Sequence, residues 1–415
     1  MTEHDRIVNS FASLHMPITR QSLEIGRDYI QKLLPEQAPV IAELDVLLSR
    51  ILAELLEAEA PDRIIIPLSA GLDSRALLGA VLRLVPRSRI LCVTVGEPSN
   101  REVVGARRIC RAQSIEHHRI DASGFVWNLD DCIRTTGRIF KDHGIFRETE
   151  FILFDQIAGL CRPGDIILSG YLGDAVSGGN MIRGDVTTRD GSFDMFLQRN
   201  RSKPDITLDP ETLEMIRAFG DAHFAHVLKT GYRNISQFEL LDIGLRQPLR
   251  IRGVSVIGDA RVICPFEDPR WLSFWFNHEL ADRIGQKRYK HALRTSYPAI
   301  FSLPDDKAGV PPKPLYARAW NRITRKLARA LPQTTAGDSE RGDPRRLESK
   351  ARMVSTLLSN LAERGHLAGW DIAAISAQYL ENPSVANTRV TNALATAEAN
   401  LAAGNLKASG IAARA

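Results

Sequence analysis

The feature that most limits how this chain can fold is a short polar loop between an apolar run and a helical pattern. The run at residues 64–66 is Ile-Ile-Ile, and the loop reads Pro67-Leu68-Ser69-Ala70-Gly71-Leu72-Asp73-Ser74-Arg75. This order is typical of a buried strand, a tight turn and a helix N-terminus, which favours an anion. Hydroxyls of Ser69 and Ser74 suit phosphate oxygens, and Asp73 suits a Mg²⁺ ion between itself and phosphate. We interpret the loop as a cradle for a Mg²⁺-nucleotide; the alternative is a serine-capped helix start without a ligand.

The bulk composition excludes several other classes of protein. The net charge of +5 over 415 residues is mild, so we expect no nucleic-acid partner. The five cysteines are scattered without a C-x-x-C pair, which fits buried thiols in a reducing compartment rather than a zinc site or a disulfide framework. The first residues lack the layout of a signal peptide, and no run is long enough for a membrane span. We therefore expect a cytoplasmic protein of two or three domains.

The order of the apolar runs predicts an α/β fold with a parallel, doubly wound sheet. Residues 1–60 have a helical pattern, and from residue 62 apolar runs alternate with helical segments. The strands are expected near residues 63–68, 90–95, 117–121 and 165–170. Continuous Ile, Leu and Val runs of this kind indicate strands that are covered on both faces. Ligands of such sheets lie at the carboxyl ends of the strands, where the Ser69 loop is expected.

A second glycine-rich turn follows the last of these runs. It reads Ser169-Gly170-Tyr171-Leu172-Gly173-Asp174-Ala175-Val176-Ser177-Gly178-Gly179. We expect Asp174 to face Asp73 from a neighbouring strand end, because two carboxylates and phosphate oxygens suit Mg²⁺. Turns of this composition are common, so a plain turn is the alternative.

Together the two turns resemble the asparagine synthetase family, within the PP-loop ATP pyrophosphatases. The first is similar to the family's S-G-G-L-D-S loop, with Ala70 in place of a glycine, and the second to its S-G-x-G-x-D-E turn. Three later segments resemble family landmarks: residues 264–268, 288–294 and 304–309. The resemblance covers about residues 62–313 and implies an adenine nucleotide alpha hydrolase-like fold. It implies a helical N-terminal extension at 1–60, an ATP-pyrophosphatase/synthetase domain at 61–314 and a helical C-terminal region at 315–415.

The resemblance also implies roles for individual residues. The pyrophosphate of ATP and Mg²⁺ would be held by the first loop, and Mg²⁺ also by Asp174; the loop residues are Ser69, Gly71, Asp73 and Ser74. Leu68 and Val95 would flank the adenine, and Gly170 belongs to the nucleotide-binding residues. Lys307 would reach the pyrophosphate and the charge that develops during attack, although a surface lysine is the alternative.

One residue departs from asparagine synthetases. Tyr171 stands where they carry a glutamate, and the related β-lactam synthetases carry a tyrosine there that works with a glutamate to take a proton from an attacking amine. Tyr171 is therefore a candidate general base. The partner glutamate is not evident, because residues 245–252 offer Arg, Gln and Pro; Glu239 and Glu267 are substitutes by proximity. Alternatively, Tyr171 only lines the substrate pocket.

The predicted function is an AMP- and pyrophosphate-forming ligase that joins a small-molecule or peptide carboxylate to an amine or ammonia. A glutaminase domain is not expected, because about 60 residues precede the first strand, so a separate glutaminase or carrier is a candidate partner. Rivals are a lactam-forming synthetase, a tRNA-modifying PP-loop enzyme and a non-catalytic homologue that binds a partner. Specificity is expected within 142–156 and 180–235. Residues 315–331 form a basic amphipathic segment, which is either a packed helix or a contact for an acidic partner.

Overall fold

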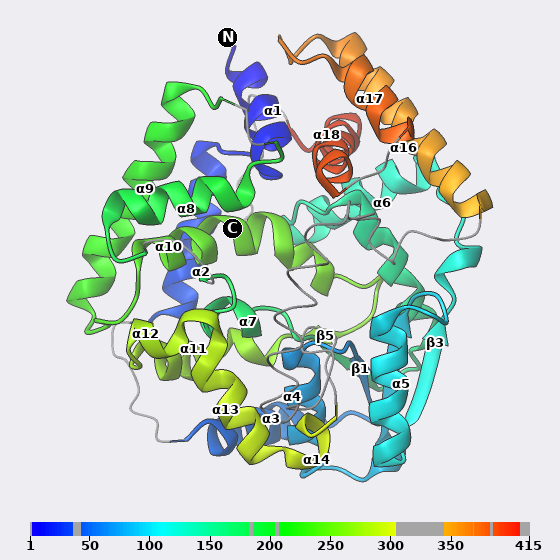
Figure 1. Cartoon of the computed structure of the whole chain (residues 1–415), viewed down its shortest axis with the longest axis vertical. Coiled ribbons are helices and arrows are strands. Elements are labelled where there is room, and N and C mark those ends of the chain that lie inside the picture. Colours follow the sequence, from blue (N-terminus) through cyan, green and yellow to red (C-terminus); the bar gives the residue numbers. More distant parts are fainter. Residues whose placement is uncertain are drawn as a thin grey trace, which may run out of the picture.

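The molecule contains a five-stranded parallel sheet, which lies in the lower part of the view in Figure 1 with β3 at its outer edge. The computed structural model describes residues 2–35, 43–181, 186–203, 207–303, 344–367, 369–381 and 385–406. The strand order is β3-β2-β1-β4-β5. The strands are β1 (Arg63–Pro67), β2 (Ile90–Val95), β3 (Glu116–Ile120), β4 (Asp165–Leu168) and β5 (Val262–Ile263). The sequence did not predict β5, because two residues are too short for a pattern.

The apolar runs are continuous because the sheet is covered on both faces. In β1, Ile64 and Ile66 contribute to the main hydrophobic cluster, whereas Ile65 contributes to a second cluster. Successive side chains of a strand point to opposite faces, so each face is filled by every second residue. Helices α4 (Leu72–Val81) and α5 (Arg101–Gln113) pack in the main cluster, and the 3₁₀ segment η3 (Thr149–Leu160) in the second. This arrangement is compatible with a doubly wound fold.

The strand order reverses beside β1, which matters for ligand binding. From β1 the chain passes through α4 to β2 and through α5 to β3, all on one side of β1. It then returns through α6 (Leu129–His143) and η3 to β4, on the other side of β1. The carboxyl ends of β1 and β4 thus lie at the point where ligands of open α/β sheets bind.

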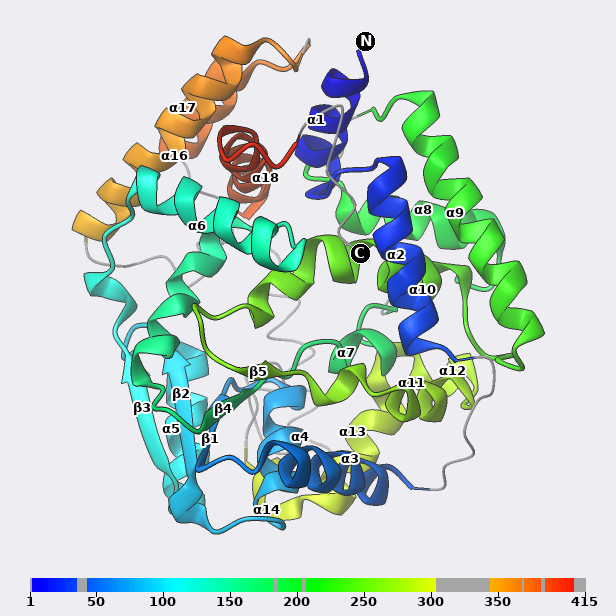
Figure 2. The same cartoon turned by 180° about the vertical axis from the view of Figure 1, so that it is seen from behind.

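The N-terminal residues form helices, as expected, and these share the core of the sheet. They are α1 (Glu3–Leu14), α2 (Arg20–Leu33) and α3 (Leu44–Glu59). Helix α3 buries one apolar face, which consists of Leu44, Leu47, Leu48, Ile51 and Leu52. Side chains of α2 and α3 belong to the same hydrophobic cluster as β1. Helix α2 lies along η4, a π-helical segment at Asp242–Ile251 that directly follows α10 (Gln237–Leu241) (Figure 2).

The remaining helices lie around this core. Within 180–235, where the sequence pattern is irregular, the structure has α8 (Arg189–Asn200) and α9 (Pro210–Lys229). After β5 the chain forms α11 (Pro269–Phe276), α12 (Leu280–Arg283), α13 (Lys287–Ser296) and α14 (Pro298–Phe301). Three C-terminal helices pack with α1 in a separate hydrophobic cluster; they are α16 (Pro344–Arg364), α17 (Ile372–Glu381) and α18 (Val385–Ala402). The predicted basic segment 315–331 lies outside the described residues.

Two expectations about the whole chain can be checked against the structure. All five cysteines are free, but only Cys92, Cys110 and Cys132 are buried, while Cys161 and Cys264 are half-buried. The expectation of five buried thiols is therefore right for three of them. Among the described helices, none is both long and apolar enough to cross a bilayer.

Candidate functional site

The loop between β1 and α4 is held by its own hydroxyls. The Ser69 amide donates to Ser74 Oγ at 3.1 Å, and the two serine Oγ atoms lie 3.0 Å apart. The Gly71 amide donates to Ser69 Oγ at 3.1 Å, and α4 begins at the next residue. The hydroxyls and the first turn of α4 thus surround one spot, the arrangement that favours an anion.

Ala70 fits this loop because α5 approaches it closely. A Cβ atom on Gly105 of α5 would lie 2.9 Å from Ala70 Cβ, and Ala70 is buried. The Ala70 amide donates to Glu102 Oε2, in the first turn of α5, at 2.5 Å. This amide, like those of Ser69 and Gly71, is therefore satisfied within the protein, and an anion here would bind to the N–H groups in the first turn of α4 and to the hydroxyls.

The second turn contacts the first, as the sequence predicts. A Cβ atom on Gly173 would lie 2.6 Å from Asp73 Cγ and 3.0 Å from the Phe266 ring. A Cβ atom on Gly170 would lie 3.3 Å from the Ser74 amide nitrogen. Between these glycines, Leu172 has a left-handed φ of 74°, which costs a non-glycine residue about 1–3 kcal/mol and is typical of functional turns. Any side chain at 173 would push the two turns apart.

The two aspartates lie near one buried tyrosine. Tyr289 of α13 donates its hydroxyl to Asp73 Oδ1 at 2.9 Å. Burial, and then the charges of Asp73 and Asp174, raise the pKa of Tyr289 well above its ordinary value, so Tyr289 stays a neutral donor. Among the described residues no three His, Cys, Asp or Glu side chains form a metal-binding group. Two carboxylates do fit a Mg²⁺ ion that arrives with a nucleotide and keeps phosphate and water ligands.

The predicted adenine-flanking residues lie at neighbouring strand ends. Leu68 is buried just after β1, and its amide donates to the Val93 carbonyl of β2 at 2.8 Å. Thr94 donates its hydroxyl to the Leu68 carbonyl at 2.7 Å. Val95 ends β2 and is half-buried. The structure thus places Leu68 and Val95 at the same edge of the sheet as the Ser69 loop.

Tyr171 belongs to a chain of hydroxyls that ends on a carboxylate. Its side chain is buried just after β4, and its oxygen lies 3.1 Å from the hydroxyl oxygen of Tyr29. Tyr29 donates to Glu267 Oε1 at 2.7 Å. The geometry allows Tyr29 to donate to either Tyr171 or Glu267. A hydroxyl has a single proton, so when Tyr29 donates to Glu267, its oxygen can accept a hydrogen bond from the Tyr171 hydroxyl. Burial, partly offset by the hydrogen bond with Tyr29, raises the pKa of Tyr171 well above its ordinary value.

Glu267 ends this chain at the border of a cavity. The cavity has a volume of about 480 Å³, and Glu267 and Arg252 both line it. Arg252 Nε lies 3.2 Å from Glu267 Oε1, and Lys32 Nζ lies 3.7 Å from Oε2. Glu267 is therefore the nearby carboxylate that could exchange a proton with Tyr171 through Tyr29.

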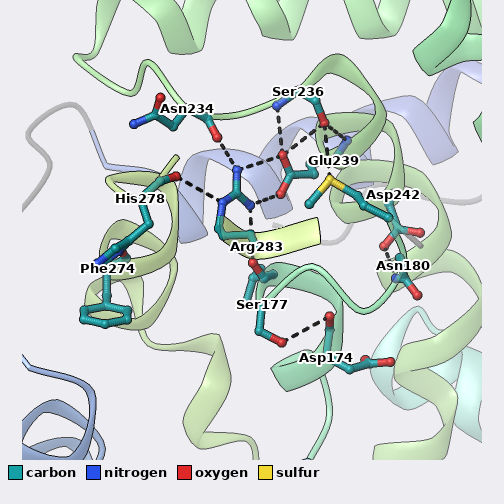
Figure 3. Close-up of polar contacts among 12 residues, drawn as sticks. Asp174, Ser177, Asn180, Asn234, Ser236, Glu239, Asp242, Phe274, His278 and Arg283 are labelled. Carbon is teal, nitrogen blue, oxygen red and sulfur yellow. Dashed lines mark hydrogen bonds and ion pairs between the residues drawn. The ribbon is translucent and has the colours of Figure 1, made fainter. Parts of the chain in front are cut away.

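Glu239, the other glutamate considered for this role, is committed elsewhere. It forms a buried ion pair with Arg283, and its Oε2 accepts from the Ser236 amide at 2.9 Å and the Ser236 hydroxyl at 3.0 Å (Figure 3). Arg283 also donates to the Val176 carbonyl at the end of α7 (Gly173–Val176). No contact of Glu239 with Tyr171 is found among the described residues. Glu239 thus supports the turn that carries Asp174.

Sequence reasoning missed Tyr29 and Tyr289. Tyr29 lies on α2, in the predicted N-terminal extension, and Tyr289 lies in the landmark segment 288–294 without a role assigned to it. The segments 264–268 and 288–294 do meet the two turns, through Phe266 and Tyr289. Lys307 and the rest of the 304–309 landmark lie outside the described residues.

No model of a known protein family matches this chain, and no curated protein matches it. The possible chemistry of the candidate site is therefore inferred from the side chains that form it. They are two serine hydroxyls, two carboxylates on adjoining turns and a tyrosine chain that ends on a third carboxylate.

Proposed function

We propose that this protein is an ATP-dependent, AMP-forming carbon–nitrogen ligase, similar in chemistry to asparagine synthetases. The observation that carries the proposal is the contact of Asp73 with Gly173, which joins the two turns at the ends of β1 and β4. A hydroxyl-rich loop and two carboxylates at that position suit the Mg²⁺-bound polyphosphate of ATP.

The first step joins the substrate carboxylate to AMP. A carboxylate oxygen attacks the α-phosphorus of ATP, and the bond to the bridging oxygen breaks, which releases pyrophosphate. Ser69, Ser74 and the first turn of α4 would hold the departing pyrophosphate, since they surround one spot. Asp73 and Asp174 would hold Mg²⁺, which when bound neutralises charge on the phosphates. The protein contributes position and preorganised charge.

The second step forms the amide and needs a proton acceptor. A nitrogen attacks the acyl carbon of the adenylate, AMP leaves, and the nitrogen loses a proton. Because the pKa of Tyr171 is raised, its hydroxyl is neutral in the resting enzyme. It can take the proton from nitrogen only while it passes its own proton to Tyr29, which passes one to Glu267. This relay lets a neutral tyrosine act as a general base.

The relay also favours a second candidate, a lactam-forming synthetase. An amine within the substrate is usually protonated and must lose a proton before it can attack, so a built-in acceptor is of use there. Attack by ammonia needs a proton acceptor as well. The mass of the product therefore has to distinguish amidation from lactam formation.

The test is pyrophosphate release from Mg-ATP with a panel of amino acids, dicarboxylates and short peptides, with and without ammonium. We expect release to depend on one class of carboxylate and to be lost in Asp73→Asn. A product lighter than the substrate by one water indicates cyclisation, whereas incorporation of labelled ammonium indicates amidation. ATP binding without release for any carboxylate would contradict the proposal and favour a non-catalytic homologue.

A further inference from the structure

A cavity of about 490 Å³ lies next to the site and is lined mainly by arginines. They come from α8, η4 and α18, which are far apart in the sequence: Arg199, Arg246, Arg250 and Arg389. Asn180 and Gln198 add amide groups to the wall. A cavity of this size accommodates a small molecule.

The arginines outnumber the carboxylates that balance them. Arg246 Nη1 lies 3.2 Å from Asp242 Oδ1, and Arg250 Nε lies 2.5 Å from Glu148 Oε1. Arg199 donates instead to the side-chain carbonyl of Asn180, and Arg389 to the backbone carbonyl of Arg199. Within the described part of the chain, neither has a carboxylate at ion-pair distance. Among the described residues, the cavity wall therefore carries two more positive charges than carboxylates that pair with them.

The uncompensated charges are partly buried, which is costly without a bound anion. Burial, and then Arg250, Arg246 and Arg199, lower the pKa of Arg389 to about 10. The Nε atoms of Arg199, Arg246 and Arg389 are buried and have no hydrogen-bond partner. Buried charges and polar groups are normally paired. An anion in the cavity would supply the counter-charge that Arg199 and Arg389 lack among the described residues.

The cavity adjoins the turn that carries Asp174. The Gly179 amide donates to the Asp174 carbonyl at 2.7 Å, and Asn180 follows directly. Asn180 Nδ2 donates to Asp242 Oδ2 at 2.9 Å, and Figure 3 shows Asp174 and Asn180 on this one turn. The Asp174 charge partly offsets the fall in the pKa of Arg199, which burial and Arg246 cause. A molecule in the cavity is thus within reach of the proposed ATP site.

We propose that this cavity binds the acceptor substrate, that is, the carboxylate substrate that receives the nitrogen. We propose that this substrate is a compact polyanion with two or more carboxylate or phosphate groups. Planar guanidinium groups bind both kinds of oxyanion through paired hydrogen bonds. The assignment to the acceptor rests on the ligase function proposed above, whereas anion binding does not. One carboxylate would extend toward Asp174, and the other anionic groups would stay among the arginines.

The binding test uses the full chain, with citrate as the carboxylate probe, 2,3-bisphosphoglycerate as the phosphate probe and acetate as the monoanion. We expect either polyanion to raise the melting temperature and acetate to have no effect. In Arg389→Gln we expect at least a tenfold loss of affinity for the polyanion, measured by calorimetry. A larger effect of one probe decides between carboxylate and phosphate.

The unliganded variant separates binding from a structural role. Removal of an uncompensated charge should leave the melting temperature of unliganded Arg389→Gln unchanged or higher, whereas a purely structural arginine would lower it. Arg199→Gln is a second variant with the same expectation. Arg352→Gln, on α16, is the control, because its side chain is 75% exposed and does not line the cavity. Equal affinity for the polyanions in wild type, Arg389→Gln and Arg199→Gln would overturn the proposal.

Failure of this proposal can be told apart from failure of the ligase function. If the protein is a ligase and the inference is right, Arg389→Gln raises KM for the polyanionic acceptor at least tenfold and changes kcat little. Pyrophosphate release that needs only a monocarboxylate, with KM unchanged in Arg389→Gln, overturns the inference but keeps the ligase. Polyanion binding that Arg389→Gln abolishes, without pyrophosphate release for any acceptor, keeps the binding site but refutes the ligase.

Discussion

Two glutamates near the candidate site, Glu239 and Glu267, have very different surroundings. The side chain of Glu239 is 2% exposed and pairs with an arginine that is 0% exposed, and Ser236 saturates its second oxygen. The side chain of Glu267 is 13% exposed, borders a cavity and accepts a hydroxyl proton from Tyr29. Both glutamates have an arginine partner, but Glu239 is enclosed by that arginine and Ser236, whereas Glu267 also ends a hydroxyl chain at a cavity. Glu239 therefore supports structure, whereas Glu267 is placed to exchange protons.

The closed cluster of Glu239, Arg283 and Ser236 contacts the turn that carries Asp174. Arg283 contacts the end of α7 through the Val176 carbonyl, and α7 begins beside Asp174. Gly178 has a φ of 93°, and any Cβ there would collide with the Arg283 carbonyl. Gln286 donates to Ser177 Oγ at 3.0 Å. Variants of the closed cluster around Glu239 and Arg283 are therefore expected to lose stability. Variants of the reactive edge, which we define as Asp73, Tyr29 and Glu267, are expected to lose turnover.

The largest effect is expected when the closed pair is broken. Arg283→Met should lower the free energy of unfolding by about 3–5 kcal/mol, because Glu239 would be left buried and uncompensated. Urea unfolding measures this loss. The double variant Arg283→Met/Glu239→Gln should recover part of it, since no lone charge then remains. Equal stability of wild type and Arg283→Met would show that Glu239 is not closed in as described.

Asp73→Asn tests the reactive edge. We expect pyrophosphate release to fall about 10³-fold, because a charge that is preorganised for the phosphates is lost. The free energy of unfolding should change by less than about 1 kcal/mol, since the asparagine oxygen can still accept from Tyr289. A loss of stability as large as that of Arg283→Met would place Asp73 with the supporting cluster instead.

Tyr29→Phe and Glu267→Gln test the relay. Both should slow the amide-forming step by about 10²-fold, the usual worth of general acid–base catalysis. Exchange of pyrophosphate into ATP reports the first step alone and should be retained in both variants. Glu239→Gln is the matched control, with lower stability and no selective effect on the second step. Loss of both partial reactions in Tyr29→Phe would indicate a structural role for this tyrosine.

Local patterns predicted four of the five strands and both turns, because strands, turns and helix starts depend on neighbouring residues. Asp174 was expected to face Asp73, since adjacent parallel strands end at one edge, and the structure joins the two turns through Asp73 and Gly173. Tyr29 could not be predicted, because on a helix with an apolar stripe a tyrosine looks like any core residue. The choice of Glu267 over Glu239 needed three-dimensional contacts that join residues 238 positions apart.

The smallest expected effect concerns His15, which extends the comparison to a titrating group. His15 is 3% exposed, and its ring nitrogens have no hydrogen-bond partner. Burial, and then Arg250, Arg389 and Arg246, lower the pKa of His15 well below 6.5. Glu148 Oε1 lies 3.6 Å from Nδ1 and favours the charged form, but burial and three arginines outweigh one carboxylate. His15 is thus buried like Glu239, but among the described residues its ring nitrogens make no hydrogen bond.

The sign of its effect on stability follows from proton binding. As the pH falls through 6.5, His15 takes up a proton in the unfolded chain but not in the folded protein, so acid favours unfolding. The contribution of neutral His15 to the free energy of unfolding is fully present above pH 6.5. Below pH 6.5 it falls by about 1.4 kcal/mol for each pH unit. His15→Asn should abolish this slope, and asparagine tolerates the left-handed φ of 60° found here. Urea unfolding of both proteins between pH 7.5 and 5 measures the difference. Parallel curves, or a wild type that gains stability in acid, would mean that His15 protonates in place and pairs with Glu148.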